Sequence, residues 1–148
     1  MAIKSSTGLA AHLMVTGSAK EAFDGGFIKV YSGAEPATAD AAATGDLLWT
    51  ISVNGDGTGL TFDAAAVGRA IVKPTAAIWG GATTAGIANY WRLVEAADDG
   101  TFSTSAPRWQ GTCGSTAGAD FYMSSTTLTT DAALLAKILS AFSVALPA

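Results

Sequence analysis

Residues 27–53 read FIKVYSGAEPATADAAATGDLLWTISV, and this stretch decides the fold because it predicts two β-strands joined by a long loop. In the first strand, 27–31, Ile28 and Val30 face one side, and the odd-numbered residues face the other. In the second strand, 47–53, the odd-numbered residues from Leu47 to Val53 share one face. The connection contains Pro36 and a run of small residues, and it is too long for a tight hairpin. We expect it to be a fixed connection, lying either along its own sheet or against a neighbouring subunit.

The composition fits one small domain that assembles with others. A chain of 148 residues is long enough for a single core. We divide it into residues 1–26, an N-terminal arm packed on the domain, and residues 27–148, a single β-sandwich domain. Only 14% of the residues are charged, against about 25% in ordinary soluble domains. So few charges favour a surface that is partly covered by partners.

Charge and cysteine content exclude several classes of function. The formal net charge is -4, and the eight Lys and Arg residues are scattered, so we expect no nucleic-acid binding. The longest apolar run, 132–146, is interrupted by Lys137 and is too short to span a bilayer, so we expect no membrane partner. Cys113 is the one cysteine, which excludes an internal disulfide and a cysteine-based metal cage. The sequence therefore suggests synthesis in a reducing cytoplasm.

The remaining chain predicts a short helical arm followed by many short strands. Ser5-Ser6-Thr7 resembles a helix N-cap, Gly17 ends that helix, and residues 20–23 add a turn. Residues 54–59 are interpreted as a hairpin turn rather than a calcium loop. Strands or extended segments are predicted at 60–62, 69–73, 87–96, 108–113 and 119–125, with a final strand at 138–146 after a short helical turn or loop.

This pattern predicts a mainly all-β fold, an antiparallel β-sandwich or jelly roll with a short N-terminal helical arm. The short strands come at regular spacing and are separated by glycine-rich turns. The predicted core consists of Ile28, Val30, Trp49, Ile51, Phe62, Leu93, Phe121, Phe142 and Val144.

No group of residues suggests catalysis. His12 is the one histidine, and it lies among small apolar residues of the arm, where a general base is not expected. Asp98-Asp99 is followed by glycine, and adjacent aspartates in that context predict a solvated turn rather than a catalytic pair. We therefore predict no enzyme activity, no cofactor and no metal site. The main alternative from the residues alone is sugar binding, in which Trp79 beside a flexible Gly80-Gly81 loop would stack on a pyranose ring.

Several motifs, taken in order, resemble a family of small virion proteins of tailed bacteriophages. Each motif alone is weak, but the series covers most of the chain. The segments are Val30 to Gly45 with Leu47, Leu48 and Ile51, then NGDGTGLTFD at 54–63, WRLV at 91–94 with Asp98-Asp99-Gly100, Gln110-Gly111-Thr112, and the closing strand with Pro147.

The resemblance implies a non-enzymatic structural protein, foremost a capsid decoration or cement protein that stabilises the head shell. Alternatives are a tail or neck protein, or a glycan- or receptor-binding β-sandwich module. The implied partners are the major capsid protein and further copies of the chain, which we expect to form a trimer. The chain would be made in the bacterial cytoplasm and would end on the outer surface of the capsid. Candidate interface residues are Glu35, Pro36, Thr38, Asp40 and Trp79.

Overall fold

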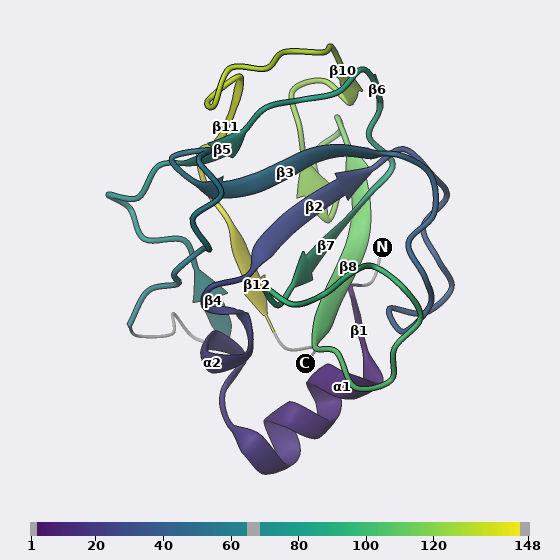
Figure 1. Cartoon of the computed structure of the whole chain (residues 1–148), viewed down its shortest axis with the longest axis vertical. Helices are drawn as coiled ribbons and strands as arrows, with labels where there is room; N and C mark the ends of the chain where they lie inside the picture. Colours follow the sequence, from purple (N-terminus) through teal and green to yellow (C-terminus); the bar gives the residue numbers. More distant parts are fainter. Residues whose placement is uncertain (1–2, 65–68, 146–148) are drawn as a thin grey trace.

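The two strands predicted within residues 27–53 are β2 (Phe27–Tyr31) and β3 (Leu47–Val53), an antiparallel pair in the middle of a large sheet (Figure 1). The structure is a computed structural model that describes residues 3–64 and 69–145. The strand order is β1, β8, β7, β2, β3, β5, β11, and β9 joins β8 as an eighth strand. All pairings are antiparallel except β8 with β9. The other strands of this sheet are β1 (Lys4–Ser5), β5 (Trp79–Gly81), β7 (Tyr90–Val94), β8 (Arg108–Gly114), β9 (Phe121–Tyr122) and β11 (Lys137–Leu139).

Two short antiparallel ladders accompany the sheet. β4 (Ala70–Val72) pairs with β12 (Ser143–Ala145), and β6 (Gly86–Ile87) pairs with β10 (Thr127–Leu128). The predicted strand 87–96 is therefore divided, because β6 and β7 pair with different partners. The prediction of a mainly antiparallel β fold with a short N-terminal helix is confirmed, and the arrangement is compatible with a sandwich.

A bulge changes which residues of β3 reach the core. The β2–β3 register shifts between Val30 and Tyr31, so that Tyr31 pairs with Leu47. Leu48 is consequently 2% exposed and Leu47 is 43% exposed. The predicted alternation placed Leu47 on the same strand face as Trp49 and Ile51, and it fails at Leu47 and Leu48 because simple alternation cannot anticipate an extra residue in one strand.

The core lies on one face of the central strands. Eight of the nine predicted core residues are buried, and Phe142 is partly buried against them. All four tryptophans are 2% exposed or less. The Phe142 ring contacts the rings of Phe62, Trp79, Trp91 and Phe121. The core is therefore rich in aromatic side chains.

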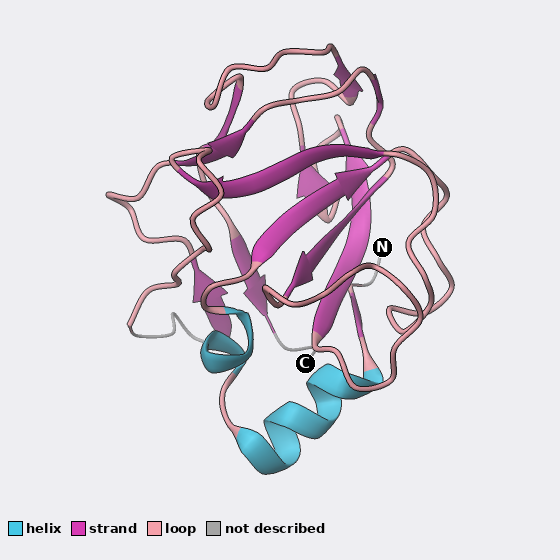
Figure 2. Cartoon of the chain, viewed as in Figure 1, coloured by secondary structure: helices cyan, strands magenta, loops and turns pink. Residues whose placement is uncertain are grey.

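The N-terminal arm packs on this core at one end of the sheet (Figure 2). It contains α1 (Thr7–Ala11), a π-helical turn (His12–Thr16) and α2 (Ala19–Phe23). The predicted cap is present, since the Ser6 hydroxyl accepts a hydrogen bond from the Leu9 N–H at 3.0 Å. Leu9 and Phe23 are fully buried, and the Phe23 ring stacks on Trp109 with centroids 5.3 Å apart. This packing stabilises two helices that are too short to be stable alone.

The final strand predicted at about 138–146 is divided into two short strands. β11 and β12 pair with β5 and β4, respectively, and Phe142 lies between them with its side chain turned into the core. Burial of this ring interrupts the ladder that the alternating pattern predicted. Leu146 and Pro147 lie outside the described residues.

Candidate functional surface

The second face of the central sheet is polar, although most of it is buried. Lys29, Arg92, Gln110 and Lys4 follow one another in register across β2, β7, β8 and β1. Arg92 and Gln110 are 1% and 0% exposed. A sheet face with this composition normally meets water. Here the loop between β2 and β3 covers it.

Arg108 is the main anchor of that loop. Its Nη1 atom donates to the backbone oxygens of Ala39, Asp40 and Ala41 at 3.2, 3.3 and 3.4 Å. Its Nε and Nη2 atoms donate to the Asp98 carboxylate at 2.5 and 2.9 Å, and both side chains of this ion pair are 1% exposed. A buried bidentate pair of this kind fixes geometry, and the remaining donors of the guanidinium order the loop backbone.

Further hydrogen bonds attach both ends of the loop to the same face. Gln110 Nε2 donates to the Pro36 carbonyl at 2.7 Å. The Tyr90 hydroxyl accepts from the Thr44 N–H at 2.8 Å and donates to the Thr44 carbonyl at 3.0 Å. The loop, on the right of Figure 1, is thus a fixed connection along its own sheet, one of the two predicted alternatives.

Four of the five candidate interface residues belong to this loop. Pro36 is buried, and Thr38 is exposed. Glu35 is half-buried beside Lys4, with Oε2 and Nζ 3.1 Å apart. Asp40 is half-buried and accepts hydrogen bonds from the Thr7 N–H and hydroxyl at 2.7 and 2.6 Å. The loop therefore offers a preformed surface, but many of its polar side chains already form hydrogen bonds or ion pairs within the protein.

Trp79 lies apart from the other four and is 0% exposed. Its ring packs edge-on against Phe62 with centroids 5.3 Å apart. The predicted flexible loop after it is strand β5, paired with β3 on one side and β11 on the other. A Cβ added at Gly81 would lie 2.1 Å from the Thr50 oxygen, so glycine is required for close strand contact. The interpretation of Trp79 as an exposed sugar platform was therefore wrong.

An exposed apolar patch surrounds β11, and sequence analysis did not identify it. We call it the β11 surface, and its members Ile78, Leu134, Leu135 and Ile138 are 47%, 59%, 38% and 55% exposed. Ile138 is in register with Gly80, and a Cβ added at Gly80 would lie 3.0 Å from the Leu135 side chain. Clustered exposed apolar side chains of this kind mark interaction surfaces. Nothing in the sequence indicated this patch, because the run before β11 was interpreted only as a short helical turn or loop and Ile78 is distant from it in the chain.

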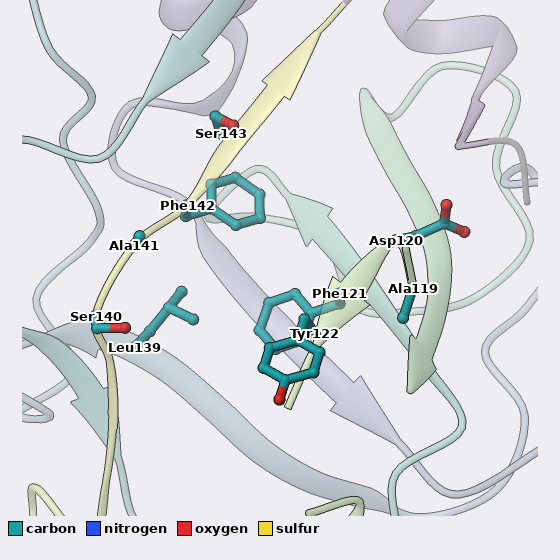
Figure 3. Close-up of a pocket in the computed structure, with 9 residues that line it drawn as sticks. All are labelled: Ala119, Asp120, Phe121, Tyr122, Leu139, Ser140, Ala141, Phe142 and Ser143. Atoms are coloured by element: carbon teal, nitrogen blue, oxygen red, sulfur yellow. The ribbon is translucent and has the colours of Figure 1, made fainter. Parts of the chain in front are cut away.

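A groove lies beside the β11 surface (Figure 3). It has a volume of about 440 Å³, with Phe121 and Tyr122 on one side and Leu139 and Phe142 on the other. A second depression of about 210 Å³ is lined by both Tyr122 and Ile138 and connects the groove with the β11 surface. Tyr122 is 61% exposed. The groove and the patch together form one continuous, largely apolar surface.

The residues that could carry catalytic or metal-binding chemistry lie apart from one another or already form ion pairs and hydrogen bonds within the protein. The described part of the chain holds no cluster of three or more His, Cys, Asp or Glu side chains that could bind a metal ion.

The prediction that Asp98 and Asp99 form a solvated turn was wrong for Asp98, which is buried against Arg108. Asp99 lies at the surface and accepts a hydrogen bond from the Thr101 N–H at 3.0 Å. The local sequence could not reveal this difference because the partner of Asp98 lies ten residues away.

Cys113 is expected to be unreactive in the folded protein. Burial, with a smaller effect from Asp120, raises the pKa of this thiol to about 12. At pH 8 only about one molecule in ten thousand would carry the thiolate. Alkylation with iodoacetamide, followed by mass spectrometry, should therefore be far slower for the native protein than for the same protein in denaturant. Native labelling at the rate of a free cysteine would contradict this prediction.

Comparisons with known proteins identify no relative: no family model, no curated protein and no solved structure matches the chain. None of the helices within residues 3–64 and 69–145 is long and apolar enough to cross a membrane. The resemblance to bacteriophage virion proteins consequently rests on the sequence motifs alone.

Proposed function

We propose that this chain is a non-enzymatic structural protein of a bacteriophage virion, and specifically a capsid decoration protein that assembles with itself and with the major capsid protein. The observation that carries the assembly part of this proposal is the β11 surface. Four exposed aliphatic side chains gather at the last strand of the sheet in a protein with few charges. The virion part rests on the motif resemblance.

The fixed loop supports the same proposal. Surfaces that bind many copies of a partner need little affinity per contact, because symmetric assembly multiplies weak contacts. A loop already ordered by Arg108, Gln110 and Tyr90 loses little conformational entropy on binding. Its exposed residues are small, which allows close approach of another backbone. They include Ala34, Ala37, Thr38 and Ala42.

Replacing Ile138 with lysine is expected to weaken self-association at least about 10-fold, because burying an isoleucine contributes about 1.5–3 kcal/mol and the new charge must be desolvated. Native mass spectrometry over a concentration series would measure the change. The wild-type protein is expected to form a cyclic oligomer, a trimer in the simplest arrangement.

Ile87→Lys provides a matched control. Ile87 is 57% exposed, close to the 55% of Ile138, and lies outside the β11 surface on the β6–β10 ladder. The control should associate like the wild type. A wild-type monomer at all concentrations that also fails to bind procapsids would refute the proposal, and rings of another order that bind tails would indicate a tail or neck protein.

A further inference from the structure

The groove in Figure 3 lies between two strands that are each paired on one side only. Residues 119–122, which lead into β9, line one side of the groove, and residues 139–143, which lead into β12, line the other. Among the described strands, β9 pairs only with β8, and β12 pairs only with β4. In Figure 3, β9 lies between β8 and the groove, so its open edge borders the groove. An open strand edge is a template for pairing with another chain.

On β9, the main chain of Tyr122 is directed to the open edge. The hydrogen-bonding groups of a strand point alternately to its two sides, residue by residue. The Met123 N–H donates to the Gly114 carbonyl of β8 at 2.8 Å. The N–H and carbonyl of Tyr122, the preceding residue, therefore point away from β8 and toward the groove.

On β12, the same reasoning applies to Ser143. The Lys73 N–H donates to the Phe142 carbonyl at 2.9 Å, so the main chain of Phe142 faces the side of β4. Val72, the cross-strand neighbour of Ser143, accepts instead from the Asp63 N–H at 3.0 Å, on the side of β4 away from β12. The N–H and carbonyl of Ser143 therefore point away from β4.

The floor of the groove belongs to the hydrophobic core. Phe121 and Phe142 come from opposite sides of the groove, and their ring centroids are 6.4 Å apart. Phe121 and Leu139 are 4% and 8% exposed, whereas Phe142 is only partly buried. An apolar side chain placed over this floor removes further apolar surface from water. The groove thus offers main-chain hydrogen bonds at its borders and apolar contacts at its base.

We propose that the groove binds an extended segment of a partner protein, which inserts as a strand between β9 and β12. Main-chain groups of Tyr122 and Ser143 hydrogen-bond to the segment from its two sides. Apolar side chains on the inner face of the segment cover Phe121 and Phe142. Main-chain pairing of this kind provides affinity, and the apolar floor selects which side chains face inward.

A second copy of this chain is not the source of the segment. Every strand within residues 3–64 and 69–145 already pairs within its own molecule, so a second copy would have to take a strand out of its own sheet. A partner with a free extended segment avoids that cost. Neither Tyr122 nor Ser143 belongs to the β11 surface, so this binding and the self-association proposed above can be tested separately.

Peptides selected on the wild-type protein from a displayed library of random sequences, each about eight residues long, test the proposal. When the protein is saturated with a selected peptide, the amides of Tyr122 and Ser143 should exchange hydrogen at least about 10-fold more slowly, as measured by NMR. Failure to select any peptide, or selected peptides that leave both amides unprotected, would overturn the proposal. Protection of both amides in the peptide-free protein would also overturn it, because the chain itself would then fill the groove.

A pair of variants at one position separates main-chain from side-chain recognition. Tyr122→Pro removes the N–H that faces the groove, and proline is accommodated at an edge position whose N–H does not bond within the sheet. Tyr122→Ala is the matched control, because it loses the same side chain and keeps the N–H. Tyr122→Pro should bind a selected peptide at least about 10-fold more weakly than Tyr122→Ala does. Equal affinities would overturn the proposal, and if Tyr122→Pro does not fold, the exchange measurement on the wild type decides.

Discussion

Replacing Asp98 with alanine is expected to destabilise the protein by about 3–5 kcal/mol, because it leaves the guanidinium of Arg108 buried without its counter-charge. Both side chains of this pair are 1% exposed, so water cannot take the place of the carboxylate. Denaturant unfolding followed by tryptophan fluorescence would measure the loss, since all four tryptophans are buried.

Asp99→Ala is the matched control. Asp99 is the next residue and bears the same charge, but its carboxylate only accepts local hydrogen bonds from Thr101 at the surface. This variant should unfold close to the wild-type denaturant midpoint. Similar midpoints for the two variants would mean that the Asp98–Arg108 pair is not the stabilising feature we describe.

A double variant separates the charge from the packing. Replacing Asp98 with leucine and Arg108 with methionine together should be less damaging than Asp98→Ala, because no unpaired charge remains. The double variant should still loosen the loop, since Arg108 donates to three loop carbonyls. Faster hydrogen exchange of the Ala43 N–H, which donates to Gly100, would report that loosening.

The sequence predicted the parts of this molecule that depend on local pattern. Alternation located Ile28 and Val30 in the core, and the Ser6 cap and Gly17 stop bounded the first helical segment of the arm. These signals act over a few residues and need no knowledge of distant partners.

Features that depend on distant contacts were missed. The burial of Asp98 follows from Arg108 and the loop carbonyls, and the burial of Trp79 follows from β3 and β11 on either side of β5. The β11 surface was missed because Ile78 lies far in the chain from Leu134, Leu135 and Ile138, and only the structure shows that these four side chains are exposed together. Alternation placed Lys29 on the face opposite Ile28 and Val30, but nothing local indicated that Arg92 and Gln110 would be buried on that face beneath the loop.

Phe142→Ala is expected to cost about 2–4 kcal/mol, somewhat less than a fully buried phenylalanine, because the ring is only partly buried. Phe142 joins four aromatic side chains that belong to different parts of the fold: Phe62, Trp79, Trp91 and Phe121. It also holds the chain between β11 and β12 over the core, and its carbonyl accepts from the Lys73 N–H at 2.9 Å. Loss of the ring should therefore loosen the C-terminal segment as well as the core.

Unfolding measurements and limited proteolysis together distinguish these two effects. Ser143→Ala is the control, because Ser143 is the exposed neighbour of Phe142 and lines the same groove. In Phe142→Ala, cleavage between residues 139 and 143 should become faster under conditions in which the sheet remains folded, because β11 and β12 are only three residues long and lose their shared anchor. Cleavage in this segment that is no faster than in Ser143→Ala would show that the β4–β12 and β5–β11 ladders hold it without the ring, and only the loss of core stability would then remain attributable to Phe142.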